Sequence, residues 1–193
     1  MPPVTASRAW QVLLVGGPSA VGKTTVAYRL AARYGIGITE IDDLHQAARA
    51  MTTAREQPLL HEADAWRRLS EDGRLARMRA ISAALSPAIT AVVAQHIEAR
   101  VPVVLEGDFL LPALAADLVS GGGVRAIFLD EGDEGRIARN LEVREGRAQA
   151  ERARASWRHG QWLRGECMAL GLPLVPARPR QTVLERCVAA IGG

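Results

Sequence analysis

The chain has 193 residues, of which 48% are hydrophobic, and a formal net charge of +3. This length suits a single domain over 1–193. Within it, we expect residues 1–9 to form a loose tail. The mild charge, with arginines scattered along the chain, argues against a nucleic-acid partner. No apolar run approaches the roughly 20 residues of a membrane span, and the tail has no signal-peptide pattern. We therefore expect a cytoplasmic monomer or homodimer with no membrane partner.

Apolar runs of strand length alternate with segments of helical periodicity along the chain. The expected strands are 10–16, 37–41, 101–105, 124–129 and 172–175. The expected helices are 22–34, one from Leu44, three divided by Gly73 and Pro87 within 63–99, and then 111–119, 134–143, 150–170 and 182–191, the last capped by Thr182 with Glu185. This alternation predicts an α/β fold with a five-stranded parallel sheet covered by helices on both faces. Ligands are expected at the carboxyl edge of that sheet.

Between the first strand and the first helix, Gly17–Thr24 fits the phosphate-binding pattern of Gly, four residues, and Gly-Lys-Ser/Thr. Lys23 is the only lysine in the chain, and its compact ammonium suits a place between β- and γ-phosphates. The hydroxyl of Thr24 is expected to ligate Mg²⁺. The motif predicts a three-layer P-loop NTPase fold that binds ATP and Mg²⁺. The nucleotide-binding residues that it predicts are Gly17, Ser19, Ala20, Val21, Gly22, Lys23, Thr24 and Thr25.

Two adjacent carboxylates end the second expected strand. Asp43-Leu44-His45-Gln46 fits a capping box, which gives Asp43 a structural role as N-cap. Asp42 is then the freer side chain and the candidate general base that accepts the proton of an acceptor hydroxyl. The alternative, in which both residues only cap the helix, stays open.

The histidines divide into two groups. His45 lies beside the acidic pair and is expected to contact the acceptor. His61 and His159 have no metal-like surroundings, so we expect both at the surface.

The third expected strand is followed by Glu106-Gly107-Asp108. An acid directly after this strand commonly reaches the water shell of Mg²⁺, so Glu106 is a candidate metal residue. Asp108 is two residues further along and shares a face with Glu106 if the strand continues, which makes it a candidate substrate residue. Gly107 would allow a ligand to approach closely. The alternative is a solvated strand end.

A cluster of arginines follows the fourth expected strand: Arg136, Arg139, Arg144 and Arg147. We expect this Arg-rich region, at about 136–160, to form a lid that closes over the γ-phosphate and neutralises charge during its transfer. Two of the four arginines are expected to act. The candidates are Arg139 and Arg144 for catalysis and Arg136 for the nucleotide.

These features resemble the small P-loop kinases of the nucleoside-monophosphate-kinase-like group, which include gluconate kinase, shikimate kinase and chloramphenicol phosphotransferase. The segments similar to gluconate kinase are Asp42-Asp43-Leu44-His45, Met51 with Pro58-Leu59 and Asp64-Ala65-Trp66, and Ile127-Phe128-Leu129 with Asp133 and Arg139. Those similar to chloramphenicol phosphotransferase are Ile41-Asp42-Asp43-Leu44 and Arg144-Glu145-Gly146-Arg147 with Gln149. The resemblance implies ATP-dependent phosphorylation of a small-molecule hydroxyl, with Asp42 as the base and Arg178 beside the adenine.

The chain also departs from gluconate kinase. Glu40-Ile41-Asp42 stands where that family has Asp-Gly-Asp, and Glu106-Gly107-Asp108 stands where it has basic residues. Two carboxylates would repel an acidic acceptor, which favours a neutral or cationic one such as a sugar, amino sugar, nucleoside or antibiotic. Two alternatives remain: a nucleotide-binding switch or ATPase without a small acceptor, which usually carries a guanine-reading Asn-Lys-x-Asp that this chain lacks, and a kinase of the zeta-toxin type.

Overall fold

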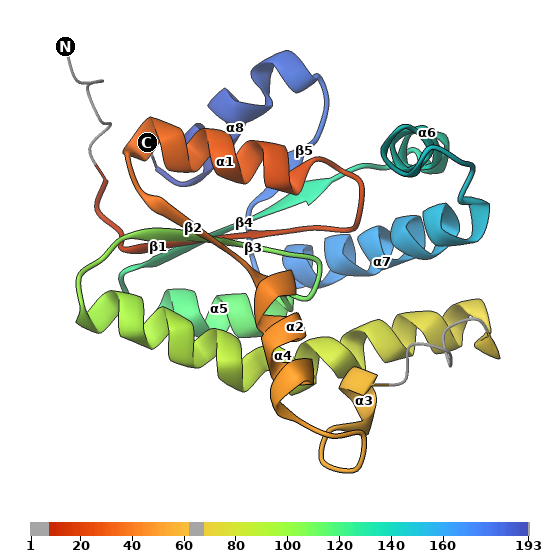
Figure 1. The fold of residues 1–193 in the computed structure, drawn as a ribbon. Coiled ribbons are helices and arrows are strands. Elements are labelled where there is room, and N and C mark those ends of the chain that lie inside the picture. Colours follow the sequence, from red (N-terminus) through yellow and green to blue (C-terminus); the bar gives the residue numbers. More distant parts are fainter. Residues whose placement is uncertain (1–7, 62–67, 193) are drawn as a thin grey trace.

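The computed structural model describes residues 8–61 and 68–192 (Figure 1). One sheet of five strands, all parallel, has the order β2-β3-β1-β4-β5. The strands are β1 (Val12–Gly16), β2 (Gly37–Glu40), β3 (Val103–Glu106), β4 (Val124–Asp130) and β5 (Leu174–Pro176). The helices are α1 (Lys23–Tyr34), α2 (Ile41–Met51), α3 (Pro58–His61), α4 (Glu71–Glu98), α5 (Pro112–Ser120), α6 (Glu134–Glu145), α7 (Ala150–Ala169) and α8 (Val183–Ala190), the last preceded by the 3₁₀ turn η2 (Arg180–Thr182).

Helices cover both faces of the sheet, as expected for parallel strands that are apolar on both sides (Figure 1). On one face α1 and α8 pack on Leu13, Val15 and Ile127. On the other face α4, α5 and α7 pack on Leu14 and Phe128. The expected α/β fold with a five-stranded parallel sheet is confirmed.

The register brings the carboxyl ends of the strands to one edge. Glu40 of β2 pairs with Glu106 of β3, and Gly16 of β1 pairs with Phe128 of β4. The loops that follow these residues therefore meet at this edge, where a parallel α/β sheet binds its ligands.

The start of α2 differs from the sequence-based expectation. The helix begins at Ile41 and not at Leu44, so Asp42 and Asp43 lie in its first turn, where carboxylates are favoured by the helix dipole. The N-cap is Glu40, without a side-chain hydrogen bond. The expected capping box on Asp43 is therefore wrong. Ile41 is fully buried, and this burial starts the helix earlier than its polar residues suggest.

Helix α4 corrects a second expectation, because it runs unbroken through both expected break points. Ser70 caps it by accepting a hydrogen bond of 3.2 Å from the backbone N–H of Gly73, which therefore belongs to its first turn. Pro87 lies inside the helix, where a proline removes one backbone hydrogen bond. Leu85 and Ile89, on either side of it, are buried in the core, and this packing offsets the loss.

The apolar content of α4 is also higher than expected. This helix of 28 residues is long and apolar enough to cross a membrane, with a mean hydropathy of 1.4 over its most apolar window. Length and composition alone do not separate a membrane span from a core helix. Leu85, Ile89 and Val93 are packed in the core on one face of the sheet, while 22% of the apolar window is buried in total.

Two further expectations concern shorter segments. The capping box expected on Thr182 is absent, because its side chain makes no cap hydrogen bond to α8. Asp64-Ala65-Trp66, which carried part of the resemblance to gluconate kinase, lies outside the described residues.

Candidate active site

The loop between β1 and α1 has the conformation that its glycines permit. Gly17 has a φ of +137°, and a Cβ there would lie 2.6 Å from the carbonyl oxygen of Leu129. Gly22 has a φ of +99° and directly precedes Lys23, the first residue of α1. Both backbone conformations favour glycine, which explains why the motif has glycine at these two positions. The loop ends at the N-terminus of α1, where backbone N–H groups favour phosphate.

Helices α6 and α7 hold this loop from the side. The amide of Asn140 donates to the carbonyl oxygen of Ala20 at 2.8 Å, and the hydroxyl of Ser156 donates to that of Ser19 at 2.7 Å. A Cβ at Gly160 would lie 3.0 Å from the ring of Pro18, which shows how closely α7 approaches. The region expected to form a lid is therefore in contact with the phosphate-binding loop in this structure. Its closing motion stays a prediction.

The side chain of Lys23 is 5% exposed and points into the edge of the sheet. Its ammonium donates to the carbonyl oxygen of Pro18 at 2.9 Å and forms an ion pair with the carboxylate of Asp108. Burial on its own would raise the pKa of Asp108, but the charge of Lys23 outweighs it and holds this pKa below its usual range. The two charges at the centre of the site thus neutralise each other.

Thr24 and Glu106 form a second pair beside the first. The hydroxyl of Thr24 donates to Oε1 of Glu106 at 2.8 Å. Burial raises the pKa of Glu106, against the opposing effects of Lys23 and the Thr24 hydroxyl. Hydroxyl and carboxylate oxygens are the ligands that Mg²⁺ prefers, so this pair fits the metal. Within 8–61 and 68–192 no group of three or more His, Cys, Asp or Glu could hold a metal alone, so phosphate oxygens would complete the site.

Asp42 is positioned by the contact between the residue that follows β3 and the start of α2. A Cβ at Gly107 would lie 2.7 Å from Cβ of Ile41, so this glycine lets the start of α2 approach β3. Ligand approach was the sequence-based reason for Gly107, and this packing is the role that the structure gives it. Asp42 keeps exposed surface, yet surrounding atoms desolvate its carboxylate and, together with the charge of Asp108, raise its pKa. A raised pKa suits a general base.

Two cavities meet at this point. The first has a volume of about 540 Å³ and runs along the phosphate-binding loop from Ser19 to Val26 and on to Ala177 and Val183. The second, of about 310 Å³, lies against α2, α4 and α7. Four residues line both cavities and form their shared border: Ser19, Asp42, Asp108 and Arg152. We call these the donor cavity and the acceptor cavity.

The predicted loop residues line the donor cavity, with the exception of Gly17: these are Ser19, Ala20, Val21, Gly22, Lys23, Thr24 and Thr25. Glu106 and Arg144 also lie in its wall. His45 lines the acceptor cavity. The structure thus brings together most of the residues predicted from sequence, although their roles stay predictions.

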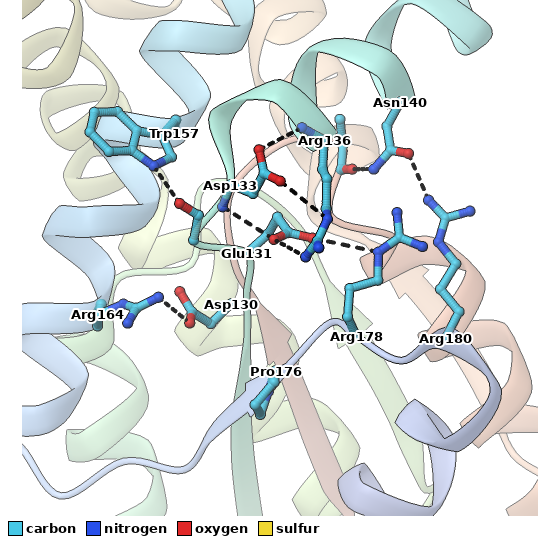
Figure 2. A network of polar contacts seen from close by, with 12 residues as sticks. Asp130, Glu131, Asp133, Arg136, Asn140, Trp157, Arg164, Pro176, Arg178 and Arg180 are labelled. Atoms are coloured by element: carbon cyan, nitrogen blue, oxygen red, sulfur yellow. Dashed lines mark hydrogen bonds and ion pairs between the residues drawn. The ribbon is translucent and has the colours of Figure 1, made fainter.

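Three predicted arginines lie elsewhere. Arg136 and Arg178 both pair with the buried Glu131, each at 3.5 Å (Figure 2), and line neither cavity. Arg139 is exposed and lines neither cavity. Arg180 lines the donor cavity, where Arg178 was expected. Its guanidinium donates to Oδ1 of Asn140 at 2.8 Å (Figure 2).

Besides Arg180, two residues at the acceptor cavity were not predicted from the sequence. Arg152 of α7 reaches the border of the cavities, and its Nη1 lies 3.0 Å from Oε1 of Glu145. Arg152 belongs to no recognisable motif and does not follow a strand end, so the sequence gave no signal for it. The expectation that His159 lies at the surface is wrong, because this residue is 3% exposed and lines the acceptor cavity. Only the packing of α7 against the loop reveals either residue.

Solved structures of other proteins share the fold of this chain. No family model matches this chain. A gluconokinase from Sinorhizobium meliloti 1021 superposes with a TM-score of 0.54 at 22% identity, over 96% of this chain and 93% of that one. A shikimate kinase from Acinetobacter baumannii gives a TM-score of 0.55 at 15% identity, over 93% and 94%. This chain has the fold of the small P-loop kinases.

The sequence relatives of this P-loop kinase fold match only about half of the chain. A 2-phosphoglycerate kinase from Methanocaldococcus jannaschii is 29% identical over 112 residues, which are 55% of this chain and 36% of that protein. One from Pyrococcus horikoshii is 27% identical over 108 residues, 52% of this chain and again 36% of the relative. The chain therefore spans little more than a third of the length of the curated relatives that it matches.

Proposed function

We propose that this chain is an Mg²⁺- and ATP-dependent kinase that transfers the γ-phosphate to a hydroxyl of a small molecule. The observation that carries the proposal is the shared border of the two cavities. A transferase needs a donor and an acceptor on opposite sides of the phosphoryl group in flight, with catalytic groups between them. Ser19, Asp42, Asp108 and Arg152 occupy that border. A nucleotide switch has no need of the second cavity.

On the donor side, the loop N–H groups and Lys23 would bind the β- and γ-phosphates. Thr24, with Glu106 behind it, would hold Mg²⁺, which neutralises phosphate charge when bound. Lys23 is paired with Asp108 in this structure, so a phosphate that binds Lys23 would have to replace this carboxylate. Ala177, Arg180 and Val183 line the donor cavity and would lie beside the adenine.

On the acceptor side, Asp42 would orient the hydroxyl and accept its proton. The hydroxyl oxygen then bonds to the γ-phosphorus as the bond to the β–γ bridging oxygen breaks, and ADP leaves with that electron pair. Arg152 and Arg144 line the donor cavity and would face the negative charge that accumulates on the transferring group. A fixed guanidinium in such a place stabilises the transition state.

The charge argument for a neutral or cationic acceptor needs revision. It was based on Glu106 and Asp108, but Glu106 faces the donor cavity and Asp108 is neutralised by Lys23. The structural neighbours and sequence relatives include kinases named for acidic substrates. The acceptor class of this chain has to be read from its own acceptor cavity. A cytoplasmic location and a small-molecule partner belong to the same proposal.

A screen for ADP release tests the proposal. Purified protein with ATP and Mg²⁺ is offered neutral, acidic and basic hydroxyl compounds, with Lys23→Ala as the blank. At least one compound is expected to raise ADP release well above that blank. If none does, the kinase proposal fails and the nucleotide switch becomes the better account.

A further inference from the structure

The acceptor cavity contains buried polar atoms for which the protein supplies no partner. Neither ring nitrogen of His159 has a hydrogen-bond partner among the described residues, and neither does Nε2 of His45. The backbone of Asp108 lies close enough to interact with the His159 ring, but it does not reach hydrogen-bond geometry. A shielded polar group without a partner costs stability, so these nitrogens favour a ligand that can satisfy them.

Contacts around the rings fix their orientation. His159 stacks on Trp162, with ring centroids 5.7 Å apart, and Arg79 covers the indole at 5.3 Å. His45 meets the ring of Phe109 edge-on at 4.9 Å. Both imidazoles are thus held in place in the wall of one cavity of about 310 Å³, a volume at the small end of the range for small-molecule sites.

Burial favours the neutral form of both imidazoles. Burial lowers the pKa of His159 to about 4, even though the charge of Asp108 acts in the opposite direction. Burial also lowers the pKa of His45, and the charge of Arg49 adds to this effect. A neutral imidazole carries one N–H donor and one acceptor nitrogen. A hydroxyl group has the same two capacities, so the two groups match.

The two arginines in the cavity wall are compensated by carboxylates, and Asp108 is paired with Lys23 until a nucleotide phosphate displaces it. Arg74 pairs with Glu151 at 3.0 Å, and Arg152 pairs with Glu145 at 3.0 Å. Asp42 is left for the acceptor hydroxyl. The rest of the wall includes the apolar side chains of Leu75, Met78 and Phe109, which suit the C–H groups of a carbon skeleton.

We propose that the acceptor is an uncharged polyhydroxy compound, a sugar or polyol, whose hydroxyls bond to the imidazole nitrogens of His45 and His159. The inference rests on the proposed kinase function, because it assigns the ligand of its acceptor cavity. It makes His159 a specificity-determining residue that binds the acceptor and does not touch the transferring phosphate.

Histidine nitrogen resonances test this in the wild-type protein. With ¹⁵N-labelled histidine and a non-hydrolysable ATP analogue present, glycerol, ribitol and D-glucitol are titrated, each beside its matched sugar acid and amino alcohol. At least one neutral polyol is expected to shift the resonances of His159 and His45 and to leave His96 unchanged. His96 is the internal control, because it lies outside both cavities and its Nδ1 is 2.8 Å from the carbonyl oxygen of Val101.

Kinetics with His159→Phe provide the second measurement, since phenylalanine keeps the ring stack and removes both nitrogens. The KM for the polyol is expected to rise about tenfold, the worth of one good hydrogen bond, while kcat and the KM for ATP stay within about twofold. His96→Phe is expected to change neither constant.

The outcomes separate this inference from the proposed function. Binding of acids or amines alone, or of no compound, overturns the inference whether or not phosphate is transferred. A polyol that binds at His159 without being phosphorylated supports the inference and contradicts the kinase proposal.

Discussion

The ammonium of Lys23 is bound by the carboxylate of Asp108 at the border between the donor and acceptor cavities. A nucleotide phosphate that binds this ammonium must displace the carboxylate of Asp108, so Asp108 competes with ATP. We predict that Asp108→Asn tightens ATP binding by roughly three- to tenfold, as expected for the loss of one competing charged hydrogen bond. The same variant leaves Lys23 buried without its counter-charge, so the nucleotide-free protein should melt at a lower temperature. Calorimetric titration with ATP and a thermal melt measure the two effects.

Asp117→Asn is the matched control, because Asp117 is exposed on α5 and lines neither cavity. Weaker ATP binding by Asp108→Asn would contradict the competition and assign Asp108 a favourable role toward the nucleotide.

Arg152 is expected to be the arginine that stabilises the phosphoryl group during transfer, because it lies at the border of both cavities. Arg152→Gln should lower kcat by about 10²–10³-fold with a small change in the KM for ATP. Arg154→Gln is the control on the same helix, since Arg154 pairs with Glu71 and Glu134 away from the border. Equal losses in the two variants would mean that the helix as a whole, and not the guanidinium at the border, is responsible.

Asp42 should govern the acid limb of the pH–rate profile. The base must be ionised to accept a proton, so kcat falls as the pH drops through its pKa. Because desolvation and the charge of Asp108 raise this pKa, the fall should begin at a higher pH than for an ordinary aspartate. Asp42→Asn should lower kcat by about 10²–10⁴-fold. Asp43→Asn, its neighbour in the first turn of α2, should leave kcat on the plateau unchanged and move the limb only slightly to lower pH, because the charge of Asp43 makes the smallest contribution to the raised pKa of Asp42.

Thr24 should set the Mg²⁺ requirement through its hydroxyl, which lies 2.8 Å from Glu106. Thr24→Val should raise the Mg²⁺ concentration needed for half-maximal rate by about 10–100-fold, and Thr24→Ser should restore it. The measurement is turnover at fixed ATP over a series of free Mg²⁺ concentrations. An unchanged requirement in Thr24→Val would remove Thr24 from the metal site.

The donor side could be predicted from sequence because it is local. Gly17, Gly22, Lys23 and Thr24 lie within one loop, and the apolar run before it and the periodicity after it identify the flanking strand and helix. The same holds for the parallel sheet, whose five strands are short apolar runs. Boundaries were missed where burial overrides polar signals, as at Ile41, and where core packing overrides a helix breaker, as at Pro87.

The acceptor side depends on contacts between distant segments, which a single sequence does not display. Arg152 and His159 reach the site because α7 packs against the phosphate-binding loop through Ser156 and Gly160. Arg136 and Arg178 were predicted at the nucleotide site from their positions in the sequence, yet both pair with the buried carboxylate of Glu131. A charged cluster in the sequence therefore did not identify which arginines face the nucleotide.

Phosphorus NMR of the products tests the central claim most directly, because it separates transfer to an acceptor from simple hydrolysis. Wild-type protein is incubated with ATP, Mg²⁺ and each acceptor that raises ADP release. The account predicts a new phosphate-monoester resonance that grows in step with ADP and is absent with Asp42→Asn and Lys23→Ala. Formation of ADP with inorganic phosphate alone, for every acceptor, would contradict it.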